Sequence, residues 1–146
     1  MDPQSQRILQ DIVRREGRSL LQYVSDAFPW ATIKEGDALA RVQQFVKEER
    51  DSTAALVRFL QRRRVTPPYF GAYPMSFTTL NFITLDHLLP LLADAERKAI
   101  AVLENDLAHL ADPEARQLIQ GMVEMKRRHE KALEEMAAAH PEPAAR

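Results

Sequence analysis

The chain has 146 residues, of which 45% are apolar, and its 20 lysines and arginines nearly balance its 21 aspartates and glutamates. A chain of this length is about one domain long and can bury a core, and its even charge gives no electrostatic reason to expect nucleic acid as a partner. The absence of cysteine excludes disulfides, thiolate metal sites and cysteine nucleophiles.

Two features of the sequence bear on its compartment. The N-terminal stretch MDPQSQRILQDIVRREG lacks the apolar core of a signal peptide. No apolar run approaches the roughly 20 residues needed to span a bilayer. Together with the lack of cysteine, which suits a reducing compartment, these features predict a cytoplasmic protein without a membrane partner.

The first predicted helix begins at Asp2, a capping residue followed by Pro3 at the first helical position. Its apolar residues at helical spacing are Leu9, Ile12, Val13, Leu20, Val24 and Ala27. This stripe predicts one continuous helix that ends at the stretch FPWAT, residues 28–32.

The second predicted helix begins at Thr32 and Glu35, which have the spacing of a capping box, and its apolar stripe runs from Leu39 to Leu60. It ends in three arginines at 62–64. They could bind phosphate, but a solvated helix end, favoured by the negative pole of the helix dipole, is the preferred interpretation.

Residues 65–77, VTPPYFGAYPMSF, break the helical pattern with three prolines and a glycine. An extended segment of this length can cross the whole length of a helical bundle. Its aromatic residues are Tyr69, Phe70, Tyr73 and Phe77. We expect them to cover the side of the bundle, and the alternative is a groove or patch for a ligand or protein partner.

Two further helices follow. The third is predicted from about Thr78 to Leu110, with Pro90 kinking it near Asp86 or restarting it. The fourth begins at Asp112 as cap, with Pro113 at the first helical position. The connection between them is so short that they must pack antiparallel.

The predicted fold class is therefore all-α. We expect an antiparallel four-helix bundle of two hairpins joined by a long crossover, forming a single domain over residues 1–140 and followed by a disordered tail at 141–146.

Several polar residues interrupt the apolar stripes, where an unpaired group would be costly to bury. They are Glu16 in the first helix, Glu49 and Ser52 in the second, Glu96 in the third, and His129, with Lys126 on its flank, in the fourth. A neighbouring stripe of the third helix favours Asp94 or His87 instead. Each position lies near the middle of its helix, so antiparallel packing brings them to one level, and carboxylates with an imidazole at one level suit a metal site.

This layout resembles the ferritin-like superfamily, the di-iron carboxylate bundles that include ferritins and rubrerythrins. The family pattern has a Glu on helix one, Glu-x-x-His on helix two, a Glu on helix three and Glu-x-x-His on helix four. Glu16, Glu49, Glu96 and His129 match ligand positions. Ser52 stands where the first histidine is expected, and Lys126 stands where the last glutamate is expected.

Because Ser52 and Lys126 depart from the family pattern, the preferred hypothesis is a degenerate metal site. A serine hydroxyl is a poor iron ligand, and an ammonium brings positive charge to where cations would bind. Lys126 is expected to replace the metal's charge in a buried network with Glu16 and Glu49, while His129 hydrogen-bonds to one of them. The alternative interpretation is that the stripe assignments are off by one residue and that these polar side chains lie on the flanks of the helices and reach solvent.

The functional prediction is a non-enzymatic bundle without catalytic residues or a cofactor, acting through self-association or a protein partner at the four crossover aromatics. The alternative is a carboxylate and histidine metal-binding bundle that holds iron or another divalent metal. Its ligands would be Glu16, Glu49, Glu96 and His129, or a second set of His87, Asp94, Glu96 and His129.

Overall fold

The computed structural model of this protein describes residues 1–26, 35–81 and 83–139. Within these ranges the chain is all-helical and contains no strand. The α-helices are α1 (Pro3–Gly17), α2 (Leu20–Asp26), α3 (Gly36–Arg62), α4 (Leu85–Leu107) and α5 (Pro113–Ala139), and η2 (Met75–Leu80) is a 3-10 helix. None of the helices in the described ranges combines the length and apolar character needed to cross a membrane.

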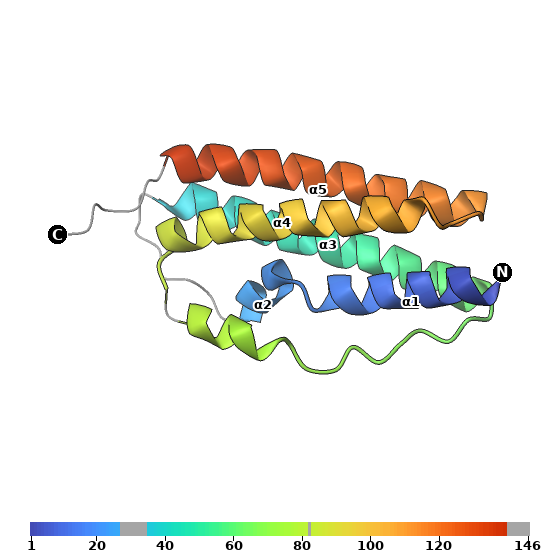
Figure 1. Ribbon diagram of the computed structural model, residues 1–146. Helices are drawn as coiled ribbons and strands as arrows, with labels where there is room; N and C mark the ends of the chain where they lie inside the picture. The colour runs from blue at the N-terminus through green and yellow to red at the C-terminus, as the bar shows by residue number, and fades with distance from the viewer. Residues whose placement is uncertain (27–34, 82, 140–146) are drawn as a thin grey trace.

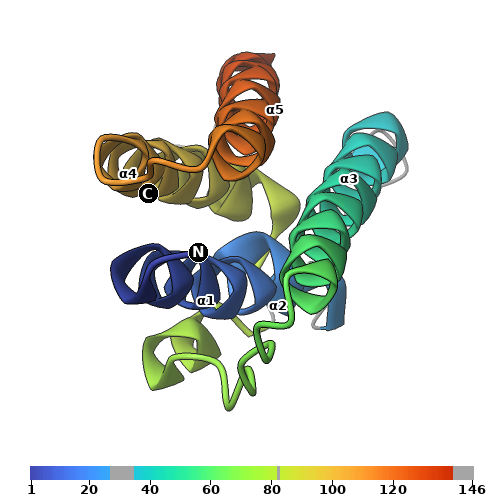
Figure 2. The same ribbon diagram turned by 90° about the vertical axis from the view of Figure 1, so that its right-hand side faces the viewer.

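The four long helices run side by side along one axis (Figure 1). In the end view α1 lies beside α3, and α5 lies between α3 and α4 (Figure 2). Helices α4 and α5 make the most extensive contact, and α3 contacts α1, α2 and α5. The chain reverses direction between α4 and α5, so these two helices are antiparallel, as the short connection predicts.

The first predicted helix is divided, which corrects the expectation of one continuous helix. Helix α1 ends at Gly17, and α2 begins at Leu20. Ser19 lies between them, and its hydroxyl accepts a hydrogen bond from the backbone N–H of Gln22 at 3.2 Å. A side-chain acceptor at this position satisfies a free N–H of a new helix and so favours the restart. The predicted stripe residue Ala27 and the capping residue Thr32 lie outside the described residues.

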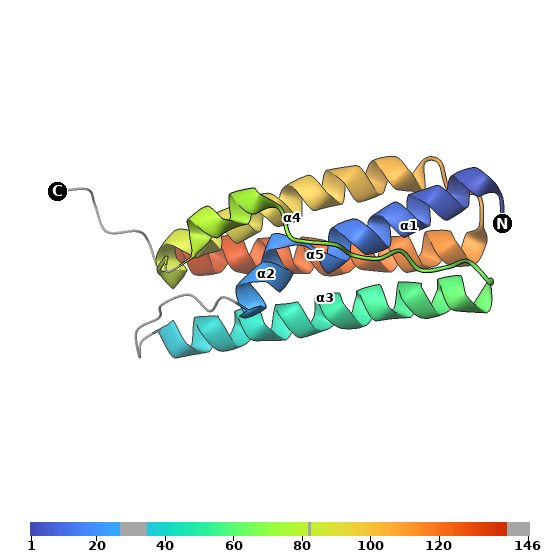
Figure 3. The same ribbon diagram turned by 90° about the horizontal axis from the view of Figure 1, so that it is seen from below.

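The segment between α3 and α4 runs back along α1, as Figure 3 shows from below. Two side chains hydrogen-bond to the backbone of this segment, one from within α1 and one from its C-terminal end. Gln10 Nε2 donates to the carbonyl of Thr66 at 2.9 Å, and Arg18 Nη1 donates to the carbonyl of Ala72 at 3.1 Å. The ring of Phe70 packs against Gly17, where an added Cβ would lie only 2.7 Å from the ring. A glycine is therefore needed at the point where this segment docks.

The four aromatic residues of the segment 65–77 were expected to cover the side of the helices, and only some of them do. Tyr73 and Phe77 are half-buried, and both contact the ring of Tyr23, with centroids 5.3 and 5.5 Å apart. Phe70 is 38% exposed, and Tyr69 is 90% exposed. The segment thus covers α1 and α2 with some of its aromatic side chains and leaves Tyr69 in solvent.

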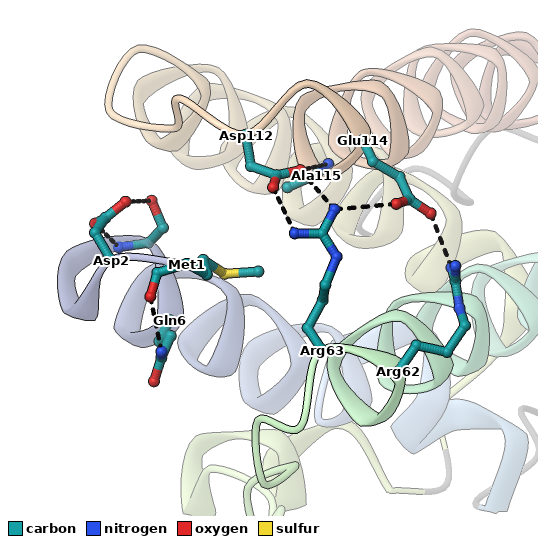
Figure 4. A network of polar contacts seen from close by, with 9 residues as sticks. Met1, Asp2, Gln6, Arg62, Arg63, Asp112, Glu114 and Ala115 are labelled. Atoms are coloured by element: carbon teal, nitrogen blue, oxygen red, sulfur yellow. Dashed lines mark hydrogen bonds and ion pairs between the residues drawn. The ribbon is translucent and has the colours of Figure 1, made fainter.

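Ion pairs join the end of α3 to the start of α5 (Figure 4). Arg63 contacts Asp112 at 2.7 Å and Glu114 at 3.2 Å, and Arg62 contacts Glu114 at 2.9 Å. Asp112 also accepts from the backbone N–H of Ala115 at 3.0 Å, which confirms it as the cap of α5. Because carboxylates already partner Arg62 and Arg63, these arginines do not form an uncompensated phosphate patch.

Helix α4 begins later than predicted. The stretch after Met75 forms η2, and α4 begins only at Leu85, with the hydroxyl of Thr84 accepting from the backbone N–H of His87 at 3.4 Å. Pro90 lies inside α4, which continues through it. Proline removes only one hydrogen bond there, and the buried leucines on either side hold the helix against its neighbours.

The core consists of two clusters of buried apolar residues, one in each half of the molecule. One contains Leu20, Val42, Val46, Leu89, Leu92 and Leu133, among others. The other contains Leu9, Ile12, Leu56, Phe59, Leu103 and Ile119, among others. Along α3, α4 and α5, and along α1 and α2 taken together, the buried ionisable residues fall between the residues of the two clusters, so the predicted common level is confirmed.

Candidate functional site: a buried lysine–carboxylate cluster

Four helices each contribute one ionisable side chain to the level between the two apolar clusters. Glu16 lies in the last turn of α1, and Glu49, Glu96 and Lys126 lie in α3, α4 and α5. Their exposed fractions are 3%, 0%, 3% and 0% in that order. We call these four residues the lysine–carboxylate cluster.

The ammonium of Lys126 lies at the centre of the cluster. Its Nζ is 2.6 Å from Glu16 Oε2, 3.2 Å from Glu49 Oε2 and 3.6 Å from Glu96 Oε2. The contact with Glu49 has the geometry of a hydrogen bond. The network predicted between Lys126, Glu16 and Glu49 is therefore present, and Glu96 joins it.

The charges of the cluster are unequal, because one ammonium faces three carboxyl groups. Burial acts to lower the pKa of Lys126, but Glu49, Glu16 and Glu96 outweigh it and raise that pKa above its usual value. Burial raises the pKa of Glu96 to about 8, although Lys126 opposes the shift. Burial also raises the pKa of Glu16. Near neutral pH the lysine is charged and Glu96 is mostly a neutral acid, which reduces the negative charge that the core must hold.

Ser19 supports the cluster from the break between α1 and α2. Its hydroxyl donates a hydrogen bond to Glu49 Oε1, while the other carboxylate oxygen accepts from Lys126. The sequence interpretation did not include Ser19. The sequence does indicate a helix start at this residue, because Ser19 and Gln22 have the Ser-x-x-Gln spacing of a capping box.

His129 is buried beside the cluster but binds a different carboxylate from the one predicted. Its Nε2 lies 2.7 Å from Glu48 Oε2, and its ring stacks on Phe45 with centroids 4.4 Å apart. The predicted hydrogen bond to Glu16 or Glu49 is therefore wrong. Burial lowers the pKa of His129 against the opposing effect of Glu48, and the hydrogen bond from His129 lowers the pKa of Glu48. This pair is a neutral imidazole on a carboxylate at the edge of the core.

Ser52 does not lie on the buried stripe of α3 as predicted. It is half-buried, whereas Thr53 is 6% exposed. After Glu49 the stripe continues with a step of four residues instead of three, and both steps suit a helix of 3.6 residues per turn. The position at which the family pattern has a histidine therefore lies partly outside the core.

The second ligand set proposed from the sequence is not assembled. His87 is exposed, and Asp94 forms surface ion pairs with Arg97 at 3.1 Å and Lys98 at 2.9 Å. These side chains are thus separated from the buried groups of Glu96 and His129. Across residues 1–26, 35–81 and 83–139, no group of three or more histidines, aspartates and glutamates has the arrangement to hold a metal ion.

The donor chemistry of the cluster also disfavours a metal ion. A cation bound by Glu16, Glu49 and Glu96 together would need the position close to all three carboxyl groups. The ammonium of Lys126 lies there, within 3.6 Å of each of them. Two positive charges in a buried site repel each other strongly, so the residues present do not fit a metal alongside a charged Lys126.

Comparisons with models of protein families, with curated proteins and with solved structures each found no match. Fold and site together define an all-helical protein with a buried lysine–carboxylate cluster. Membership of the ferritin-like superfamily stays a prediction from the layout of the helices and the positions of the buried residues.

Proposed function

We propose that this chain is a ferritin-like four-helix bundle with a degenerate metal site, and that it acts without catalysis through self-association or a protein partner. The contact of Lys126 with three buried carboxyl groups carries the proposal. In this interpretation α1 and α2 together form the first helix of the bundle, and the segment over residues 65–80 is the crossover between its two hairpins.

The physical basis is that the lysine supplies the positive charge that a metal supplies in a di-iron site. A buried carboxylate is stable only when it is paired, and an ammonium pairs it without a metal. Because the four members come from four helices, their pairing also fixes how the helices align along the bundle axis. The cluster is therefore a structural element, and the function must lie elsewhere on the molecule.

The exposed crossover supports an interaction function. Of the described residues, the large apolar side chains that remain exposed are Met1, Tyr69, Phe70, Met75 and Val102, and three of these five lie in the crossover and the start of η2. Tyr69 is 90% exposed and Met75 is 85% exposed. Aromatic residues and methionine are enriched at protein interfaces, so this segment is the proposed contact surface.

Elemental analysis of protein purified without chelators tests whether the lysine–carboxylate cluster binds a metal ion. We expect no stoichiometric metal in the wild type or in Glu49→Ala. The variant Lys126→Glu recreates the Glu-x-x-His spacing with His129, and metal uptake by this variant alone would support descent from a metal site. Near-stoichiometric iron, manganese or zinc in the wild type, lost in Glu49→Ala, would overturn the proposal in favour of a carboxylate and histidine metal-binding protein.

Sedimentation velocity over a range of protein concentrations tests whether the exposed crossover segment mediates self-association. We expect self-association that the double variant Tyr69→Ser, Met75→Ser weakens. Val102→Ser, an exposed apolar residue of α4 that is 43% exposed, is the matched control and should leave the association unchanged. A wild type that stays monomeric at every concentration would exclude self-association and leave a different protein as the partner.

A further inference from the structure

A cavity of about 530 Å³ lies between α3 and the crossover, beside the end of α1. The crossover lies on the side of α1 and α3 that faces away from α4 and α5, as the end view shows (Figure 2). The volume is within the range of about 300–1,000 Å³ that small-molecule sites occupy. The cavity is therefore large enough to hold a small molecule.

Most of the accessible wall of this cavity is apolar. Helix α3 contributes Ala54 and Val57, the end of α1 contributes Gly17, and the crossover contributes Phe70 and Tyr73. The contact of Phe70 with Gly17 holds the crossover against α1 at this point. A ligand that fills the cavity would therefore bury an apolar body against aliphatic and aromatic side chains.

The buried polar residues contribute little of the wall. Glu16, Gln22 and Thr53 line the cavity, but they are only 3%, 6% and 6% exposed. Glu16 is the only acid among the lining residues that the structure describes, and Lys126 Nζ lies 2.6 Å from its Oε2. The charge that a ligand meets in this cavity is therefore decided by the exposed residues.

Two exposed arginines of α3, Arg50 and Arg58, bring positive charge to the cavity. They lie on one side of the helix, about 12 Å apart along its axis. Ala54 lies midway between them, and its small side chain leaves room for a group that both guanidinium groups approach. Because a guanidinium group presents its N–H donors as a planar fork, this position suits a carboxylate or phosphate group.

Among the described residues, no carboxylate pairs with either arginine. Ion pairs within a helix form between residues three or four positions apart, and none of the residues at these positions from Arg50 and Arg58 is acidic. Asp51 pairs instead with Lys47, at 2.9 Å. The crossover contains no charged residue, and Arg50 Nη2 reaches only the hydroxyl of Ser25, at 3.5 Å. The two positive charges at the cavity are therefore available to a ligand.

We propose that this cavity binds an amphipathic oxyanion, a molecule with an apolar body and a carboxylate or phosphate head group. The head group lies between Arg50 and Arg58, and the apolar body lies under the crossover. A cationic head group in the same place would be repelled by two arginines, and a neutral one would leave their charge unpaired. The inference does not depend on the proposed contact surface, because Tyr69 and Met75 do not line the cavity.

Isothermal titration calorimetry of the full chain tests the proposal. The probes have equal chain length and are used below their micelle-forming concentrations: n-octanoate, n-octyl phosphate, n-octanol and n-octylammonium. Because two exposed ion pairs raise an affinity by about fivefold, at least one of the anions should bind about fivefold more tightly than n-octanol. The tighter anion identifies the head group, and n-octylammonium should bind least.

Salt separates the contribution of charge from that of the apolar body. The preference for the anions should shrink as the salt concentration is raised, because exposed charges are screened, while binding of n-octanol should not weaken. Equal binding of the anions and the alcohol, or no binding of either anion, would overturn the proposal. Tightest binding of n-octylammonium would also overturn it and assign recognition to Glu16 instead.

Three variants locate the binding. The double variant Arg50→Gln, Arg58→Gln should remove the roughly fivefold preference for the anion and leave n-octanol nearly unchanged. The matched control is Arg7→Gln, Arg128→Gln, which makes the same change in net charge at exposed positions outside the cavity. Ala54→Leu narrows the cavity without changing any charge and should weaken the anions and n-octanol alike. An equal loss of preference in the control, or unchanged binding of the anions in folded Ala54→Leu, would overturn the proposal.

Discussion

Replacing Lys126 by methionine removes the only ammonium from the cluster and keeps a side chain of similar length. The position is fully buried, and its Nζ lies 2.6 to 3.6 Å from three carboxyl groups that are themselves at most 3% exposed. Removing one partner of a buried ion pair costs about 3–5 kcal/mol, because the remaining charge has no compensation. That is about a third of the unfolding free energy of an ordinary domain.

The pH dependence of this loss has a defined sign. Without Lys126, which opposes both shifts, the pKa values of Glu16 and Glu96 rise further above their unfolded values. The folded variant then binds more protons than the unfolded chain, so its stability falls as pH rises from about 5 to about 8. We therefore expect the difference between wild type and Lys126→Met to be smallest near pH 5 and largest near pH 8.

Urea denaturation followed by far-ultraviolet circular dichroism measures both effects. Lys131→Met, at an exposed position five residues further along α5, is the matched control and should change the unfolding free energy by less than about 0.5 kcal/mol. Adding Glu→Gln substitutions at the three carboxyl positions should restore most of the lost stability. A loss below about 1 kcal/mol in Lys126→Met, or one that does not depend on pH, would refute the role assigned to the lysine.

Three further predictions follow from the structure. Glu96→Gln should flatten the fall in stability between about pH 5 and pH 8, measured by urea denaturation at each pH, because the native pKa of about 8 makes that carboxyl group a source of the slope. Gly17→Ala should cost about 1–3 kcal/mol and speed proteolysis of the crossover by displacing Phe70, whereas Gly121→Ala, which meets nothing within 4 Å, should not destabilise. Ser19→Ala should lower thermal stability by about 1–2 kcal/mol through the lost cap and carboxylate hydrogen bond, and unchanged thermal unfolding would contradict its role.

The level of the buried polar residues could be predicted because it depends on helical periodicity alone. Glu16, Glu49 and Lys126 interrupt apolar stripes, and each lies near the middle of its helix when α1 and α2 are counted as one, so antiparallel packing places them at one level. The caps Asp2 and Asp112 were likewise predicted from local chemistry, and both accept the expected backbone hydrogen bonds. The capping box at Thr32 and the tail at 141–146 fall outside the described residues and stay predictions.

The sequence-based predictions were wrong at positions where helical periodicity does not determine the structure. Gly17 and Ser19 interrupt a stripe that is apolar on both sides, so the pattern alone reads as one helix. Steps of three and four residues are equally helical, which is why Ser52 was chosen instead of Thr53. His129 binds Glu48, which lies beside the stripe of α3, whereas both the stripe and the family pattern point to its neighbour Glu49. Which of the two neighbouring carboxylates His129 contacts depends on side-chain rotamers and packing.

The cluster also constrains how this sequence can change over evolutionary time. Its four members lie on four different helices, and the single ammonium of Lys126 compensates all three carboxyl groups. A mutation that removes Lys126 is deleterious while the glutamates remain, and a mutation that removes one glutamate is far better tolerated. Loss of carboxylates must therefore precede loss of the lysine, and among related sequences these four positions should vary as a set.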